Sequence, residues 1–151
     1  MAYWLLKSEP DSFSIDDLEK VDSEPWDGVR NYQARNNLQA MKEGELAFFY
    51  HSNAKPPGVA GICEVVEEAK PDESQFDPGS KYHDPKATRD APRWFCPRVR
   101  FVRRFERFVP LPEIREIPEL SDMALVNRSR LSVQPVSEEH WKIICRMGDD
   151  A

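Results

Sequence analysis

The 151 residues suffice for one domain with its own hydrophobic core, and we expect a single domain over residues 1–151. The composition, 40% hydrophobic and 32% charged, excludes a disordered or collagen-like chain. No apolar run approaches the roughly 20 residues of a membrane span, so no membrane partner is expected. Three scattered cysteines indicate free thiols in a reducing compartment, which predicts a cytoplasmic location.

The net charge of −6 argues against a protein that coats nucleic acids through bulk electrostatics. The charge is uneven, however, because residues 9–24 hold seven acids and one base, whereas residues 93–107 hold six arginines and one acid. An anionic partner is therefore expected to meet a local basic surface. The candidate contacts to a phosphate backbone are Arg35, Arg98, Arg100 and Arg104. Two other interpretations stay open: a solvated strand face for the arginine-rich stretch, and ion pairs of Arg30 and Arg35 with the early acids.

The first 41 residues alternate strand and helix patterns. Residues 3–7 form a short apolar run that polar residues and a proline stop, which predicts a buried strand. Ser14 is expected to cap a brief helix with acids in its first turn. After a loop at 24–28, the helical spacing of apolar residues predicts a second helix over 31–41.

The middle of the chain predicts a sheet. Residues 46–51 are an almost continuous apolar run, as expected of a strand that is covered on both faces. A strong turn signal at 52–58 leads into a second strand at 59–66, so the pair is expected to form a hairpin. Residues 70–92 are rich in Asp, Pro, Gly and Ser, which indicates a long surface excursion before a strand at 93–109.

The last third predicts short helices at 111–117 and 120–126, a strand at 131–136 and a final helix that starts at Ser137. Strands adjacent in sequence predict a mixed α/β (α+β) fold, in which a small curved mixed sheet curls into a barrel with helices outside. The residues expected to face its interior are Leu46, Phe48, Ile62, Val65, Val99 and Phe101, and Trp4 and Trp141 are also expected in the core.

Sequence signatures of catalysis and metal binding are missing. The chain has no glycine-rich phosphate loop and no GxSxG, HExxH or CxxC motif. Asp77, His83 and Asp84 have no spacing typical of metal ligands, and solvated loop residues explain them better. Cys63 lies in an apolar strand, where a thiol has a raised pKa and low reactivity. We therefore predict no catalytic residues, no cofactor, no metal and unlinked cysteines.

Four segments combine aromatic, basic and amide residues beside the ends of expected elements. They are residues 5–10, 26–36, 49–52 and 127–134. At these residues, above all in the stretch WDGVRNYQARN, the chain resembles the EVE domain family from Tyr3 to about Met147. The resemblance implies a PUA-like pseudo-barrel with flanking short helices, related to the YTH, ASCH and SRA-type readers. Those relatives hold one modified base of RNA or DNA outside its stack. EVE domains themselves resemble readers of modified cytosine or related bases.

A base outside its stack offers two π faces and an edge of donors and acceptors, so its pocket needs flat apolar walls and a few directed polar groups. Trp26, beside Gly28, is a candidate wall, although a loop tryptophan also serves as a plug in a barrel end. The candidate ligand-binding residues are Lys7, Ser8, Glu9, Trp26, Arg30, Asn31, Tyr32, Tyr50, His51, Ser52, Arg130 and Ser132. Positional analogy with YTH segments places Lys7, Ser8, Trp26 and Ser52 around one cavity, and Trp94 is a second candidate for stacking.

Three functions are carried forward from the sequence. The favoured one is a non-enzymatic reader whose partner is RNA or DNA with a modified base. The second is a binder of a free nucleoside, a nucleotide or a similar metabolite, which the sequence pI of about 5.2 favours because a small ligand needs little backbone attraction. The third is an enzyme of nucleic-acid modification with His51 as acid or base.

Overall fold

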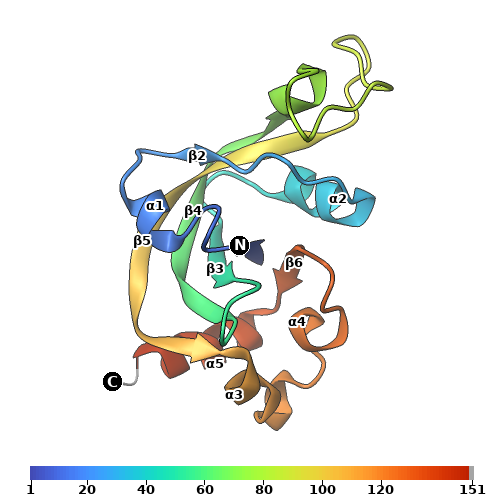
Figure 1. Ribbon diagram of the computed structural model, residues 1–151. Helices are drawn as coiled ribbons and strands as arrows, with labels where there is room; N and C mark the ends of the chain where they lie inside the picture. Colours follow the sequence, from blue (N-terminus) through green and yellow to red (C-terminus); the bar gives the residue numbers. More distant parts are fainter. Residues whose placement is uncertain (150–151) are drawn as a thin grey trace.

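The computed structural model describes residues 1–149, and a strongly curved six-stranded sheet runs through it (Figure 1). The strand order is β2-β5-β4-β3-β1-β6. The strands are β1 (Tyr3–Ser8), β2 (Glu24–Pro25), β3 (Leu46–His51), β4 (Gly58–Pro71), β5 (Phe95–Pro110) and β6 (Val133–Val136). β1 and β3 are parallel and the other neighbours are antiparallel, so the predicted mixed sheet is confirmed.

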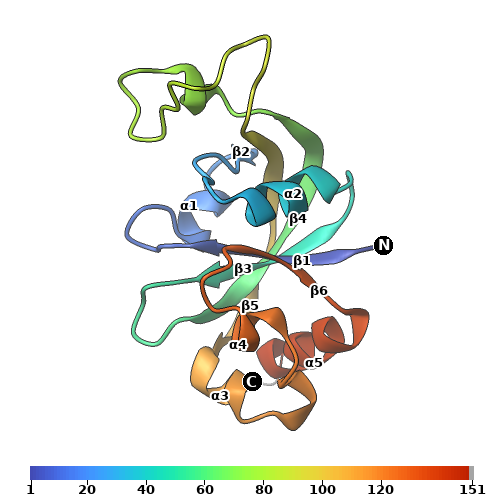
Figure 2. The ribbon, with the colours of Figure 1, turned by 90° about the vertical axis from the view of Figure 1, so that its right-hand side faces the viewer.

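The helices gather at two ends of the sheet. They are α1 (Ile15–Glu19), α2 (Tyr32–Ala40), α3 (Leu111–Arg115), α4 (Ala124–Asn127) and α5 (Glu138–Asp149), with 3₁₀ turns at Glu73–Phe76 and Pro118–Leu120. Figures 1 and 2 show α1 and α2 at one end and α3, α4 and α5 at the other, and the excursion after β4 projects beyond the α1/α2 end. Within residues 1–149, no helix is both long and apolar enough to cross a membrane.

Both faces of the sheet are buried, and they form two separate hydrophobic clusters. Along β3, Ala47 and Phe49 belong to the cluster with α1 and α2, whereas Phe48 and Tyr50 belong to the cluster with α5. This alternation is the ordinary period of a strand, with successive side chains on opposite faces. The sequence of β3 is therefore an almost continuous apolar run because both faces of the strand are covered, as predicted.

The prediction of one shared interior for six strand residues is wrong. Leu46, Phe48 and Ile62 face α5, whereas Val65, Val99 and Phe101 face α1 and α2. Ile62 and Val65 are separated by an odd number of positions on β4, so a strand sends them to opposite faces. Trp4 and Trp141 are each 6% exposed, which confirms both as core residues, although they belong to different clusters.

Several element boundaries differ from the sequence prediction because pairing between distant strands decides them. Residues 24–25 were expected in a loop but form β2, which pairs with β5 at Val99 and Arg98. β4 continues to Pro71 because β5 accompanies it that far, so the excursion spans residues 72–94 and lies two positions later than predicted. Asn31 caps α2, because its side chain accepts a hydrogen bond from the Ala34 amide.

Candidate functional site

A cavity of about 470 Å³ opens at the α1/α2 end of the sheet. Its walls come from the end of β1, the turn before α1, the segment from β2 to α2, the excursion after β4, and the residue before β6. The lining residues are Lys7, Ser8, Glu9, Ser12, Phe13, Glu24, Pro25, Trp26, Asp27, Gly28, Val29, Arg30, Lys81, Tyr82 and Ser132. Residues far apart in the sequence thus combine aromatic rings, hydroxyls and charges of both signs in one cavity.

The turn after β1 places Phe13 at the cavity. The Ser8 hydroxyl donates to the Phe13 carbonyl at 2.5 Å, and the amides of Ser12 and Phe13 both donate to the Glu9 carbonyl at 2.9 Å. These bonds close the turn and satisfy its backbone groups. The Phe13 ring then meets the Trp26 ring edge-on, with 6.4 Å between the centroids.

Trp26 is a wall of the cavity and a core residue at the same time. Its amide donates to the Pro97 carbonyl at 2.9 Å, which ties the end of β2 to β5. The indole packs edge-on against Phe49 at a centroid distance of 5.5 Å, and only 8% of the residue is exposed. The structure therefore places Trp26 both in the core and at the cavity, and the core holds its ring from behind.

Gly28 lets the excursion approach the cavity closely. Its φ of +80° lies in the left-handed region, which residues with a Cβ rarely adopt. A Cβ at this position would lie 2.8 Å from the Tyr82 ring, well inside van der Waals contact. Because Gly28 has no side chain, Tyr82 of the excursion can pack against the segment that carries Trp26.

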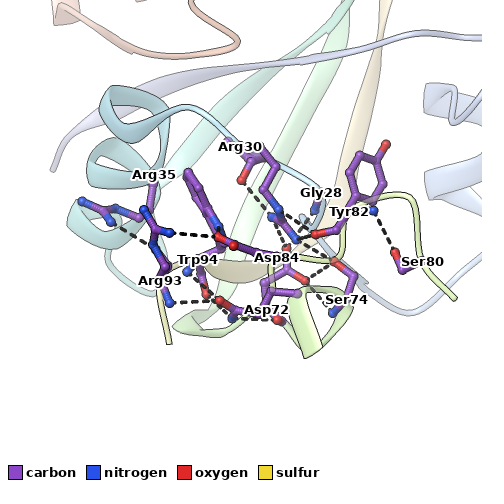
Figure 3. Close-up of polar contacts among 12 residues, drawn as sticks. Gly28, Arg30, Arg35, Asp72, Ser74, Ser80, Tyr82, Asp84, Arg93 and Trp94 are labelled. Carbon is purple, nitrogen blue, oxygen red and sulfur yellow. Dashed lines mark hydrogen bonds and ion pairs between the residues drawn. The ribbon is translucent and has the colours of Figure 1, made fainter. Parts of the chain in front are cut away.

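The buried Asp72 carboxylate organises this wall (Figure 3). It accepts hydrogen bonds from the Gly28 amide at 2.8 Å, from Arg30 Nη1 at 3.1 Å, and from the Ser74 hydroxyl at 2.5 Å. Burial alone would raise the pKa of Asp72, but the hydrogen bonds from Ser74, Gly28 and Arg30 outweigh it and hold the pKa below its usual value. The carboxylate thus stays ionised at neutral pH.

Arg30 connects the same network to the excursion. Its Nε and Nη2 donate to the Tyr82 carbonyl at 3.0 and 2.8 Å, and Nη2 also donates to the Ser74 hydroxyl at 3.0 Å. Its guanidinium lies 5.3 Å from the centre of the Trp94 ring, within cation–π range. Arg30 therefore holds the excursion, and Tyr82 with it, at the edge of the cavity (Figure 3).

Trp94 lies behind Arg30 and away from the cavity. The exposed ring of Tyr32 stacks on it with 5.0 Å between centroids, and its indole N–H donates to Asp84 Oδ2 at 2.8 Å. The Trp94 hydrogen bond is the main reason that the pKa of Asp84 is lowered. The sequence offered Trp94 as a second stacking surface for a base, but Arg30 and Tyr32 already cover the ring, which is 6% exposed.

Three charged groups of the cavity, Glu24, Asp27 and Lys7, have shifted pKa values. Desolvation raises the pKa of Glu24, with a further contribution from Asp27. Desolvation also raises the pKa of Asp27, and the Asp72 carboxylate adds to the effect. Lys7 is affected in the opposite sense, because desolvation lowers the pKa of its ammonium group. The cavity thus offers both carboxyl groups and an ammonium group to whatever enters it.

The structure brings half of the predicted ligand-binding residues to this cavity. They are Lys7, Ser8, Glu9, Trp26, Arg30 and Ser132. Asn31 and Arg130 line a second, smaller cavity beside the first. The analogy with YTH segments therefore holds for three of its four positions, and fails for Ser52.

Tyr32, Tyr50, His51 and Ser52 line neither cavity. Tyr50 is 3% exposed in the cluster with α5, and burial raises the pKa of its hydroxyl to about 12. His51 Nε2 accepts the Ile15 amide at 3.1 Å, and desolvation lowers the pKa of its ring. The end of β3 therefore supports the neighbouring β1 and α1 instead of facing the cavity.

The arginines assigned to a phosphate backbone also lie outside both cavities. Arg100 pairs with Glu64, and Arg104 pairs with Asp16 and Glu19 on α1. Arg98 donates to the Ser23 hydroxyl at 3.0 Å. Arg35 donates to the Arg93 carbonyl at 3.1 Å. The alternative of ion pairs between Arg30 or Arg35 and the early acids is wrong, because Arg30 pairs with Asp72 and it is Arg104 that binds those acids.

Phe13, Asp27 and Tyr82 line the cavity and were missed in the sequence. Asp27 stands inside the stretch WDGVRNYQARN, so the resemblance carried a signal for it. Tyr82 lies in the excursion, and no local pattern predicts which loop residue folds back onto Gly28. In the part of the chain that the structure describes, no group of three His, Cys, Asp or Glu residues is arranged to hold a metal ion.

A curved mixed sheet with a lined cavity at one end is the architecture of PUA-like domains, and the comparison with solved structures agrees. The YTH domain of Mmi1 has this fold with a TM-score of 0.54 and 11% identity over 97% of this chain and 86% of that chain. A family model, EVE domain, matches residues 2–147, and the chain belongs to that family.

Several relatives are close enough to compare over the whole chain. Human thymocyte nuclear protein 1 is 44% identical over 95% of this chain and 72% of its own length. A hypothetical protein from Leishmania major has a TM-score of 0.95 and 51% identity, covering 99% of this chain and 96% of that chain. Human THYN1, solved in complex with DNA that contains 5-methylcytosine, has a TM-score of 0.96 and 42% identity, covering 100% and 99%.

Proposed function

We propose that this chain is a non-enzymatic reader that holds an unstacked, modified nucleobase of DNA or RNA, with 5-methylcytosine as the first candidate. The observation that carries the proposal is the cavity of about 470 Å³, which joins aromatic walls to directed polar groups. Its size falls in the range of sites that enclose small organic ligands. The human THYN1 complex with DNA that contains 5-methylcytosine supports the choice of base, because the two chains share one fold over their whole length.

The chemistry of the walls suits a cytosine. Phe13, Trp26 and Tyr82 supply π surfaces for the two faces of the ring. A carboxylate accepts from the exocyclic amine of cytosine, and Asp27 offers that group at the cavity. Lys7 supplies the donor that the carbonyl oxygen of the base requires. The aromatic walls also favour a methyl group on the base, because apolar surfaces pack against it and charged groups do not.

Free nucleosides or nucleotides are the second candidate ligand class. The specific observation in their favour is the net charge of −6, which repels a phosphate backbone but matters little for a small neutral ligand. A salt titration separates the two classes. Binding to a polymer weakens steeply as salt rises, whereas binding of a neutral nucleoside does not.

The third candidate, an enzyme with His51 as acid or base, loses its geometric support. His51 lies outside both cavities, and its Nε2 is engaged with the Ile15 amide. We propose the cytoplasm as the location, on the ground of three thiols that are separate in sequence.

Binding measurements with matched oligonucleotides test the proposal directly. Single-stranded and duplex oligonucleotides carrying one 5-methylcytosine, and their unmodified twins, are titrated into the wild-type chain. We expect tighter binding of the modified member of each pair, by roughly tenfold. Equal affinities for all four would contradict a reader of this base. Digested cellular tRNA and genomic DNA, passed over the immobilised protein and analysed by nucleoside mass spectrometry, then identify which modified nucleoside and which polymer it retains.

A further inference from the structure

A second cavity of about 330 Å³ lies beside the first and differs from it in charge. It is lined by residues 127–131, between α4 and β6, together with Asn31 and Gln33 from the start of α2. Its lining contains two arginines and no carboxylate, whereas Glu9, Glu24 and Asp27 line the first cavity. We propose that the second cavity binds the phosphodiester group next to the base held in the first cavity. This inference rests on the proposed function.

The two cavities meet at two points of the chain. Arg30 lines the first cavity and Asn31 the second; likewise Ser132 lines the first and Leu131 the second. At each point the two cavities are lined by consecutive residues, whose Cα atoms are about 3.8 Å apart. A nucleotide whose base enters the first cavity therefore has its adjoining phosphate within reach of the second.

The arginines of the second cavity are available to an anion. Arg100 and Arg104 on β5 are paired with carboxylates, which neutralise them. Within residues 1–149, neither Arg128 nor Arg130 forms an ion pair with a carboxylate; Arg128 donates instead to the neutral side chain of Gln33. A guanidinium fork without a carboxylate partner matches the geometry of a phosphate group. Arg100 and Arg104 are thus neutralised by their carboxylate partners, whereas the two arginines of the second cavity keep their charge available to an anion.

The backbone around these arginines is held in place before any ligand arrives. The Arg128 amide donates to the Ala124 carbonyl at 2.6 Å, and the Leu131 amide donates to the Arg128 carbonyl at 3.0 Å. Gln134, which is fully buried, donates from Nε2 to the Leu131 carbonyl at 2.8 Å. A loop that is already ordered loses little entropy on binding, which favours affinity.

Lys7 links this loop to the first cavity. Its Nζ donates to the Ser129 carbonyl at 2.6 Å, and its amide donates to the Ser132 carbonyl at 3.0 Å. The start of α2 adds a second favourable contribution, because α2 has no acid in its first turn and a helix N-terminus attracts negative charge. The two cavities are thus parts of one rigid surface, with a base site and an anion site.

The test uses ligands that fill one cavity or both. The ligands are 5-methyl-2′-deoxycytidine, its 5′-monophosphate, its 3′-monophosphate, and a single-stranded pentanucleotide with 5-methylcytosine at its centre. The variants are Arg128→Ala/Arg130→Ala and a control, Arg115→Ala/Arg146→Ala, which removes the same charge from α3 and α5. Calorimetric titration of each ligand into each full chain gives the affinities, and circular dichroism checks that both variants are folded.

We expect one of the two monophosphates to bind the wild type about tenfold more tightly than the nucleoside, and its identity gives the strand polarity. The Arg128→Ala/Arg130→Ala variant should lose that gain and bind the pentanucleotide about tenfold more weakly, while its affinity for the nucleoside stays unchanged. Its salt dependence should also fall, by about 0.7 in the slope of log K against log salt concentration for each lost contact.

Three results would overturn the inference. If neither monophosphate gains over the nucleoside, or if the Arg128→Ala/Arg130→Ala variant and the control lose the same affinity, the second cavity is no phosphate site, although a wild type that still prefers the modified base keeps the proposed function. If the wild type shows no preference for the modified base, the proposed function fails, and the phosphate site that rests on it fails too.

Discussion

The two faces of the sheet are both buried, but they are built from different interactions. Against α5, rings stack directly, with 3.9 Å between the centroids of Phe48 and Trp141 and 4.5 Å between those of Tyr3 and Trp141. Under α1 and α2, the core continues into a cavity whose wall depends on the Asp72 carboxylate and Arg30. Apolar attraction is non-directional, whereas hydrogen bonds fix the orientation of the groups that they join. We infer that the α5 face mainly stabilises the fold and that the other face positions ligand groups.

The largest expected loss of stability comes from the α5 face. Trp141→Ala removes a ring that is 6% exposed and stacked on both Phe48 and Tyr3. A cavity of this kind destabilises by about 3–5 kcal/mol. Urea denaturation monitored by circular dichroism measures the loss. The affinity of the remaining folded protein for a 5-methylcytosine oligonucleotide should stay within twofold of wild type. A loss of affinity along with the loss of stability would contradict the inference that the two faces have different roles.

The wall of the cavity should respond to Asp72→Asn, which leaves Arg30 with a neutral partner and weakens the bonds from Gly28 and Ser74. We expect about 2–3 kcal/mol less stability at pH 7. Because folding lowers the pKa of Asp72, its carboxylate contributes stability above the unfolded pKa of about 4, and this contribution is lost as the pH falls through the lower folded value. The wild type should therefore lose its advantage over Asp72→Asn progressively as the pH falls below about 4. If the stability difference between the wild type and Asp72→Asn does not change with pH, the stabilising role of the ionised Asp72 carboxylate is contradicted.

Trp26→Ala should weaken binding of the modified oligonucleotide by roughly ten- to a hundredfold, because stacking of a base on an aromatic ring contributes about 1–3 kcal/mol. Trp26 also packs on Phe49, so the alanine variant loses stability as well. Trp26→Leu is the matched control, since it retains much of the apolar volume and lacks the ring. Affinities of both variants, corrected for the folded fraction, separate the two roles. Full affinity in Trp26→Leu would assign the residue to packing alone.

Gly28→Ala tests the approach of the excursion. The new Cβ would strain a φ of +80° and push the Tyr82 ring, so we expect about 1–2 kcal/mol less stability and severalfold weaker binding. Gly44→Ala is a close control, because Gly44 has a φ of +92° and nothing within 4 Å of its Cβ position. Thermal denaturation should show that both variants are less stable than the wild type. Titration should show weaker binding only for Gly28→Ala. Similar affinities of the two variants would exclude Tyr82 from the site.

The smallest effect is expected from Arg98→Gln, Arg100→Gln and Arg104→Gln made together. These side chains are engaged by Ser23, Glu64 and the acids of α1, and exposed ion pairs contribute only about 0–1 kcal/mol. We expect a two- to threefold loss of affinity that is the same for modified and unmodified oligonucleotides, with a slightly flatter salt dependence. A loss confined to the modified oligonucleotide would show that this stretch contributes to base selection.

The resemblance to known readers, together with local patterns, placed some residues of the candidate site correctly and others wrongly. Lys7, Ser8, Trp26 and Arg30 stand beside the ends of elements with clear hydrophobic periodicity, and the structure brings them to one cavity. Ser52 follows the same rule and fails, because its strand runs parallel beside β1 and supports it from outside the cavity. The end of a strand predicts proximity to a site, but the neighbouring strands decide which side chains line it.

The sequence by itself determined the mixed fold, the cap of α1 at Ser14, the core residues Trp4 and Trp141, and the family, because each of these depends on local periodicity or on a contiguous motif. Only the tertiary structure decided which arginines are neutralised and which are available. Arg104 reaches acids of α1 that precede it by more than 80 residues, and Arg30 reaches Asp72 across 42 positions. Charges along a chain do not reveal their partners, since Coulomb attraction depends on distance in space, and that distance is set only when the sheet is complete.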